Sequence, residues 1–329
     1  MKMEKGKIPY NSLIRSVLRV PFERKETDQV ARDGAILSCS LSASDADGVS
    51  TISASVNTTV YGGPLAEKLA FYRSLNSALA AGIEPESVML AMTLPVGEKE
   101  TTTAERMREF KAAADAENVR IAGGHTAYSN QVNAPVLTVT VSGRAYEPEK
   151  PAPGDALILT GFTGDTGAMV LNHACGERLK QRFTGDYLEG TVDAEEHLSA
   201  AKSAKILRKL SAVMHDVSEG GILGALWEFA EGHHIGFTVD EKAIPIHQET
   251  IEICEYLSGN PYTLLSTGCM LASVKDGDAA VQTLMEAGIP AVCIGVLEPG
   301  KKKKLLRNDE TRYLDRPQQD FIMELENFG

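Results

Sequence analysis

Short apolar runs typical of β-strands alternate with segments of helical periodicity along most of the chain, which restricts the fold to helices layered on sheets. In the first half, helices are predicted at 12–20, 64–82 and 101–118. Strands are predicted at 35–43, 49–57, 87–95, 119–124 and 134–145. The order β-β-α-β-α-β indicates an α+β domain.

Proline and glycine gather in EPEKPAPGD at 147–155, a composition typical of a linker. We place the domain boundary there, with an N-terminal domain at 1–148 and a C-terminal domain at 149–329. In the second domain, strands are predicted at 156–161, 235–239, 268–274 and 291–296, and helices at 193–210, from about 218 to 232, and at 277–287. The expected fold is a two-domain protein, α+β followed by α/β.

The bulk composition excludes several classes of protein. The 329 residues carry a net charge of −12, whereas a nucleic-acid surface requires clustered Lys and Arg. The one basic run, Lys301–Lys304, follows a Pro299-Gly300 turn signal and is predicted to be a solvated hairpin. The five cysteines are scattered, no apolar stretch reaches roughly 18 residues, and the start lacks the apolar core of a signal peptide. We therefore expect a cytoplasmic protein without nucleic-acid or membrane partners.

Three glycine-bearing segments each follow a predicted strand: 123–126, 161–167 and 216–221. Glycine lets the backbone approach a ligand, and the N–H groups at a helix start attract anions. Gly164, within the second segment, is one candidate for such a contact. A tight strand-to-helix turn explains each segment equally well when it is taken alone.

The most specific of these segments is HDVSEGGILGALWEFA at 215–230. Its apolar stripe predicts a helix that begins near Ser218, with Asp216 and Glu219 at its N-terminal mouth. Acidic residues there favour the helix dipole in any protein. That reading leaves Gly220 and Gly221 unexplained, because two glycines weaken the first turn of a helix.

Together the motifs resemble the AIR synthetase (PurM-like) superfamily, and within it the HypE-like hydrogenase maturation factors. The resemblance covers nearly the whole chain in order. It is carried by GKIPYNSLIRSVL, ARDGAIL, RSLNSALAAGIEP, IAGGHTA, PGDALILTG, HDVSEGGILGALWEFA and NPYTLLSTGCMLASV.

The resemblance implies an N-terminal domain that dimerises through its sheet and a C-terminal α/β domain of mixed sheet, with ATP and Mg²⁺ between them. ATP then phosphorylates a carbonyl or amide oxygen of a small-molecule or carrier-protein substrate. By this resemblance, Asp216 and His125 are candidate catalytic residues, and Asp33 and Asp216 are candidate metal ligands. The candidate nucleotide-binding residues are Asp33, Asn76, Gly123, Gly124, Thr126, Gly164, Gly220 and Gly221.

The chain departs from the family pattern where acids are expected. Arg32 precedes Asp33 in place of an acid, and the strand SASVNTT ends without an aspartate. The family's Asn-Asp pair is Asn76-Ser77, and its GGDT form is here GGHT. Mg²⁺ binding is therefore expected to be weakened, because Mg²⁺ requires several oxygen ligands. Two functions remain open: an ATP-dependent enzyme, or a non-catalytic scaffold or sensor that binds a nucleotide or another anion.

His125 has three readings at this stage: it lines the nucleotide groove, binds a metal, or bonds a neighbouring loop. Imidazole suits transition metals better than Mg²⁺, which weakens the second. The chain ends MELENFG, and its last cysteine, Cys293, lies in the predicted buried strand AVCIGV. HypE itself uses a terminal cysteine as acceptor, so HypE's own reaction is not expected here.

Overall fold

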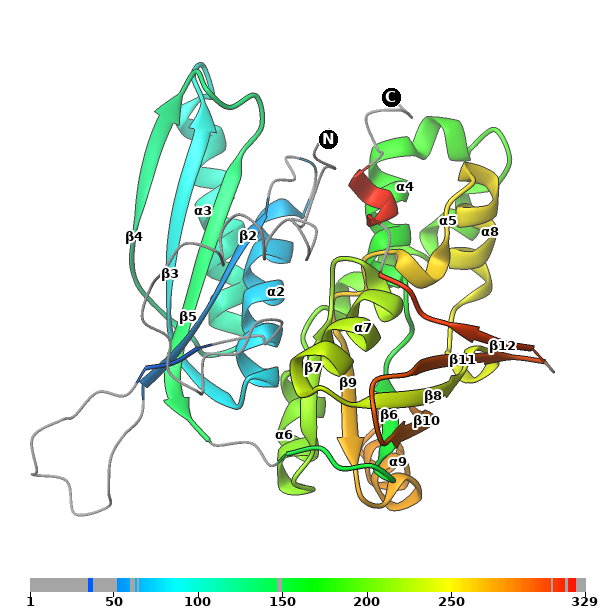
Figure 1. The fold of residues 1–329 in the computed structure, drawn as a ribbon. Coiled ribbons are helices and arrows are strands. Elements are labelled where there is room, and N and C mark those ends of the chain that lie inside the picture. The colour runs from blue at the N-terminus through cyan, green and yellow to red at the C-terminus, as the bar shows by residue number, and fades with distance from the viewer. Residues whose placement is uncertain are drawn as a thin grey trace, which may run out of the picture.

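The computed structural model describes residues 35–37, 52–59, 63, 65–146, 150–308, 310–316 and 319–323. The helix predicted at 12–20, the candidate ligand Asp33 and most of the strand predicted at 35–43 lie outside these residues. The described strands form two sheets that lie side by side, one in each half of the chain (Figure 1). β5 ends at Ala145 and β6 begins at Ala156, on either side of the predicted linker.

The sheet of the N-terminal half has the strand order β1-β2-β5-β3-β4. Its strands are β1 (Ala35–Leu37), β2 (Ile52–Thr59), β3 (Ile83–Pro95), β4 (Arg120–Ser129) and β5 (Val136–Ala145). The helices α2 (Ala66–Ala80) and α3 (Glu100–Ala116) pack on one face, where Phe71 meets Phe110 edge to face with ring centroids 5.6 Å apart. β3 alternates buried and exposed side chains, as expected of a sheet covered on one face.

Strand β4 corrects the prediction for the first glycine segment. The strand predicted at 119–124 continues to Ser129, so Gly123–Thr126 is paired with β3 and does not form a loop. A Cβ at Gly124 would lie 2.0 Å from the carbonyl oxygen of Leu90. Glycine is required here because the two strands approach closely, which local sequence does not reveal.

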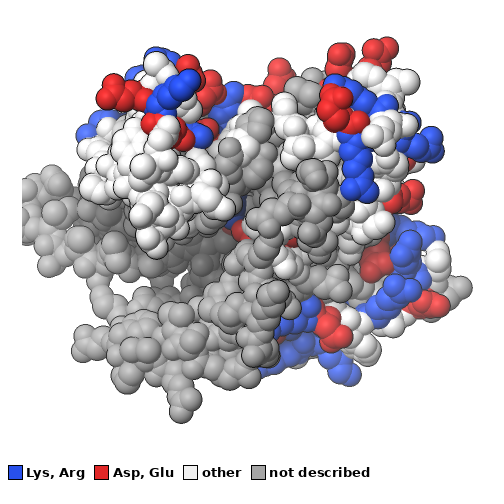
Figure 2. Space-filling view, turned by 90° about the horizontal axis from the view of Figure 1, so that it is seen from above, with Lys and Arg blue, Asp and Glu red and all other residues white. Residues whose placement is uncertain are grey.

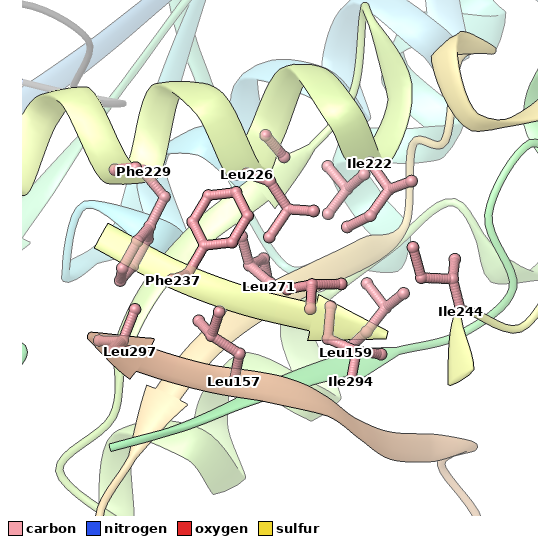
Figure 3. Packing of buried hydrophobic residues seen from close by; sticks show 14 of the residues in the cluster. Leu157, Leu159, Ile222, Leu226, Phe229, Phe237, Ile244, Leu271, Ile294 and Leu297 are labelled. Atoms are coloured by element: carbon pink, nitrogen blue, oxygen red, sulfur yellow. The ribbon is translucent and has the colours of Figure 1, made fainter. Parts of the chain in front are cut away.

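The sheet of the C-terminal half has the order β12-β11-β8-β10-β6-β9-β7. Its strands are β6 (Ala156–Thr160), β7 (Val213–Val217), β8 (Gly236–Asp240), β9 (Cys269–Val274), β10 (Ala291–Glu298), β11 (Lys303–Arg307) and β12 (Glu310–Tyr313). Its α-helices are α4 (Asp165–Leu179), α5 (Gly185–Glu189), α6 (Ala201–Lys209), α7 (Gly221–His233), α8 (Gln248–Leu257) and α9 (Gly277–Glu286). Ile222, Leu226 and Phe229 of α7 point from the helix into the sheet, against Phe237 and Leu271 (Figure 3).

Two predictions in this half are refined. The basic run begins a hairpin, β11–β12, yet Lys303 and Lys304 are paired with Glu231 and Glu298 and are not freely solvated. The strand around Cys293 forms as β10, but Cys293 itself is exposed. The register of β10 shifts next to it, between Cys293 and Gly295.

The helix predicted at 193–210 is interrupted. A 3₁₀ segment (Val192–His197) precedes α6, and residues 198–200 between them bind Asn76 of α2. The Nδ2 of Asn76 donates to the carbonyl oxygen of Leu198 at 2.8 Å, and its Oδ1 accepts from the N–H of Ala200 at 2.9 Å. A tertiary contact thus ends one segment and starts the next.

Helix α2 belongs to both halves. Phe71 and Leu75 pack on the N-terminal sheet, whereas Leu69 contacts Met169 and Val170 of α4. α2 also contacts α6 and β7 of the other half (Figure 1). Polar side chains of α2 that face the C-terminal half are therefore buried and need partners there.

We predict that Asn76→Asp destabilises the protein by about 3 kcal/mol, because a carboxylate cannot donate to Leu198 and becomes a buried charge. Urea unfolding measures this loss. The matched control is Asn130→Asp at an exposed turn, which is expected to change stability by less than about 0.5 kcal/mol. Equal stability of the two variants would contradict the role assigned to Asn76.

Candidate functional site

Polar residues of both halves meet where α2 faces β7 and the turn before α7. The Nδ2 of Asn57 donates to Ser77 Oγ at 3.1 Å, and Ser77 Oγ donates to Asp216 Oδ1 at 3.0 Å. Asp216, at the end of β7, is only 7% exposed. Asn57 and Ser77 occupy the strand and the helix where the family resemblance leads one to expect acids. The structure therefore links the two non-acidic positions, Asn57 through Ser77, to Asp216, which is the candidate acid among the described residues.

Arg73 extends this network across the junction. Its Nε donates to Ser218 Oγ at 3.1 Å, and its Nη2 contacts Glu219 Oε2 at 3.0 Å. Its Nη1 donates to Thr59 Oγ1 at 3.2 Å. The planar guanidinium thus holds the turn before α7 against β2 and α2 with donors on three nitrogens.

The glycines that open α7 have a packing reason. Gly220 is the N-cap with φ 87°, and Gly221 has φ 59°. A Cβ at Gly221 would lie 2.5 Å from the carbonyl oxygen of Tyr262. The pair therefore allows the segment around Tyr262 to pack on the start of α7, which accounts for glycines that otherwise weaken the first turn.

A buried carboxylate occupies the N-terminus of α7. Asp320 Oδ2 accepts from the N–H of Gly220 at 2.8 Å, and its Oδ1 accepts from the N–H of Ile322 at 3.1 Å. The N–H of Gly221 donates to the carbonyl oxygen of Ser218 at 3.0 Å. Both predicted glycine donors are thus bound by groups of the chain itself.

The electrostatics around Asp320 are unusual for an aspartate. Burial raises the pKa of Asp320 to about 7, while its hydrogen bonds from Gly220 and Ile322 oppose the rise. The carboxylate of Glu219 raises this pKa further, and the guanidinium of Arg73 lowers it. The pKa of the neighbouring Cys254 thiol is raised to about 12, mainly by burial, so Cys254 stays neutral near pH 7.

Gly164 is linked to this junction through Ser266. The N–H of Gly164 donates to Ser266 Oγ at 2.8 Å, and the N–H of Ser266 donates to the carbonyl oxygen of Ser218 at 3.3 Å. A Cβ at Gly164 would lie 3.2 Å from the carbonyl oxygen of Pro261. The 3₁₀ segment Pro261–Thr263 therefore separates Gly164 from Gly221. The side-chain amide of Asn76, a predicted nucleotide contact, is already engaged, because its nitrogen and its oxygen both bind the backbone at 198–200.

The segment Gly123–Thr126 does not share a hollow with Asp216 within one chain. β4 is an edge strand, and α2 and α3 lie between it and the C-terminal half (Figure 1). His125 pairs in register with Ala91, on the face of the sheet opposite these helices. The single groove that the sequence predicted for these two segments is therefore not formed by one chain, and the roles of Gly123, Gly124, His125 and Thr126 stay predictions.

The described residues do not fit a Mg²⁺ site. Mg²⁺ requires several oxygen ligands, and carboxylates supply them in most proteins. Among the described residues, no group of three or more His, Cys, Asp or Glu side chains is placed to hold a metal ion. Asp216 receives a hydroxyl hydrogen bond, and α2 brings a guanidinium to the same junction. The other predicted ligand, Asp33, lies outside the described residues.

Sequence reasoning missed Arg73 and Asp320. Arg73 stands four residues before Ser77 on α2, a spacing that places both on one helical face and could have suggested a joint site. Asp320 offered no local signal, because its partner Gly220 is 100 residues away in sequence.

The described surface adds two observations. On the face seen in Figure 2, Lys and Arg side chains lie interspersed with Asp and Glu. No helix in the described part of the chain combines the length and the apolar character that a membrane span requires.

Comparisons with known proteins give a consistent result. Residues 40–145 match the family model for the N-terminal domain of AIR synthase related protein, and residues 152–308 match that for its C-terminal domain. Carbamoyl dehydratase HypE of Rhodobacter capsulatus is 28% identical over 220 residues, which cover 65% of this chain and 63% of that protein. The chain spans 63–66% of the length of the first curated relatives that it matches.

Solved structures share the fold. A HypE–HypF complex superposes with a TM-score of 0.72 at 20% identity, covering 93% of this chain and 100% of that chain. HypE in complex with ATP gives a TM-score of 0.67 at 18% identity, covering 86% of this chain and 90% of that one. These likenesses show the two-domain PurM-like arrangement of mixed sheets.

The raised pKa of Asp320 predicts a pH dependence of stability. Between about pH 4 and pH 7 the folded protein keeps a proton that the unfolded chain has released, so the free energy of unfolding falls as the pH rises through this window. Urea unfolding at several pH values measures the slope. Asp320→Asn is expected to flatten it.

The control for this measurement is Asp186→Asn on α5, which changes an exposed aspartate and should leave the slope intact. Parallel pH profiles for the wild type and Asp320→Asn would show that the carboxyl of Asp320 titrates normally.

Proposed function

Because the chain belongs to the AIR synthase related protein family, we propose that it is an ATP-dependent enzyme whose site lies at the junction of its two halves. In the proposed reaction, a carbonyl or amide oxygen attacks the γ-phosphorus of ATP and ADP leaves. The oxygen then departs as inorganic phosphate, either as a nucleophile bonds to the carbon or, for a primary amide, as two N–H protons are lost and a C≡N bond forms. The substrate is a small molecule or a group held on a carrier protein. Relatives named carbamoyl dehydratase support the amide class.

The observation that carries this proposal is the convergence of Arg73 and Ser77 of α2 with Asp216 and the start of α7. Phosphoryl transfer requires little covalent chemistry from a protein. It depends on positioning the reacting groups and on neutralising the phosphate charge. A guanidinium supplies fixed positive charge, and a helix N-terminus supplies N–H donors. Asp216 is the proposed catalytic carboxylate, and Gly220 and Gly221 the proposed phosphate contacts.

A nucleotide- or anion-binding scaffold without turnover is the second candidate. The hydrogen bonds from Asn57 to Ser77 and from Ser77 to Asp216 favour it. They satisfy Asp216 with neutral partners at positions where the family pattern has acids, so the described residues lack the carboxylates that hold Mg²⁺.

We further propose that the protein is a cytoplasmic homodimer. The face of the N-terminal sheet opposite α2 and α3 carries a row of side chains that crosses β2, β5 and β3. In this row Val56 pairs with Thr140, and Thr140 pairs with Met89. Val56 is 62% exposed and Met89 48% exposed, and no described helix covers this face. A second copy on this face would bury these side chains. The four described cysteines are free thiols, which supports a reducing compartment.

Nucleotide titration tests the first proposal and separates the two candidates. Isothermal titration of the wild type should detect ATP at millimolar concentration, with little change when Mg²⁺ is chelated. Ser77→Asp places a second carboxylate beside Asp216, and the repulsion between the two is relieved when Mg²⁺ bridges them. The variant is expected to bind ATP about tenfold more tightly with Mg²⁺ than without it.

Absence of ATP and ADP binding at millimolar concentration would contradict the enzyme and would also exclude a scaffold that binds a nucleotide. Brisk ATP hydrolysis by the wild type would exclude the scaffold. Ser77→Ala is the matched control, because it removes the hydroxyl without adding a charge and should confer no Mg²⁺ dependence.

Light scattering after size exclusion tests the dimer. Met89→Asp places a charge in the centre of the proposed interface, so the mass should fall to that of one chain. Met285→Asp on α9 changes a methionine of the other half that is also about half exposed, and it should leave the dimer intact. A wild type of monomeric mass, or a dimeric Met89→Asp, would contradict the proposed interface.

A further inference from the structure

Residues 319–323 bring an acidic side chain to the N-terminus of α7 from the far end of the described chain. The carboxyl group of Asp320 is 2% exposed and binds the N–H of Gly220 at 2.8 Å. Its second oxygen closes a turn with Ile322, which fixes the orientation of the carboxyl group. This contact lies in the packed interior, where polar groups need hydrogen-bonding partners.

The neighbours of Asp320 anchor the segment on both sides. Phe321 is 7% exposed and packs in a cluster with Cys254, Leu257 and Leu264. A Cβ on Gly259 would lie 2.5 Å from the Phe321 ring, so the surface below the ring is shaped to receive it. Ile322 contacts the cluster that joins Leu69 of α2 to α4.

In the proposed function, the N-terminus of α7 is where a phosphate binds. An N–H at the start of a helix donates to either a carboxylate or a phosphate oxygen, and in this structure the N–H of Gly220 donates to Asp320. The guanidinium of Arg73 donates to Ser218 and forms an ion pair with Glu219, so it supplies a fixed positive charge beside the start of α7. The start of α7 is thus flanked by the guanidinium of Arg73 and by the carboxyl group of Asp320, which is an anion above about pH 7.

We propose that Asp320 is the internal occupant of the anion site at the start of α7, so that docking of residues 319–323 and binding of a phosphate-bearing ligand exclude each other. The inference rests on the proposed function, because the excluded ligand is the nucleotide of that site. A nucleotide binds only the fraction of molecules in which the segment has left, and its apparent affinity is lowered by that fraction. Release of the segment frees the Gly220 N–H and removes the carboxyl group of Asp320 from beside Glu219.

Isothermal titration with ATP, in the presence and absence of Mg²⁺, tests the proposal on the full chain. Asp320→Ala removes both oxygens that accept from the N–H groups of Gly220 and Ile322, and Phe321→Ala removes the anchoring ring. Both variants are expected to bind ATP at least about tenfold more tightly than the wild type. Asp315→Asn changes an exposed acid a few residues earlier and should bind ATP as the wild type does.

The outcomes separate the two proposals. Equal ATP affinity of the wild type, Asp320→Ala and Phe321→Ala would overturn the occupancy of the site by Asp320 and leave the nucleotide function standing. No binding by any form would overturn both.

A measurement on the wild type covers the case in which the variants fail to fold. Hydrogen exchange of the amides at 320–323 should become faster when ATP binds, because the segment leaves. Unchanged or slower exchange in the ATP-bound protein would overturn the proposal.

Discussion

Helix α2 is enclosed by both halves of the protein, and the rest of the junction depends on this enclosure. Of its 15 residues, 11 are buried, on the N-terminal sheet and against the C-terminal half. A helix enclosed in this way cannot turn its buried polar side chains to water, so each needs a hydrogen-bonding partner within the protein. Asn76 binds the backbone at 198–200, Ser77 donates to Asp216, and Arg73 donates to the turn before α7.

These contacts differ from the pattern that the family resemblance implies, which is a groove between the two halves that holds a metal with a nucleotide phosphate. Here a hydroxyl and an amide stand in sequence positions expected to be acidic, and the ionisable side chains near the start of α7 include Arg73, Asp216, Glu219 and Asp320. Opposite charges and hydrogen bonds within the chain compensate the burial of these groups.

Periodicity predicted most of the elements, because each buries one face that its own residues encode. α2, α3, β6, β9 and α9 formed close to their predicted bounds. The failures lie where a distant contact intervened. β4 continues through Gly123 and Gly124. Residue 124 must be a glycine because a Cβ there would collide with the carbonyl oxygen of Leu90 on the neighbouring strand. The helix predicted at 193–210 is divided where Asn76 binds its backbone.

The sequence by itself determined the two-layer architecture in each half, the family, and the candidate acid Asp216 beside a glycine pair. Local pattern carries this information because strands and helices are specified by neighbouring residues. Only the tertiary structure decided which candidates meet. It separated His125 from Asp216 by placing helices between them, and it brought Arg73 and Asp320 to the start of α7 from far along the chain. Contacts between residues so distant in sequence leave no periodic trace, because the path of the folded chain sets them.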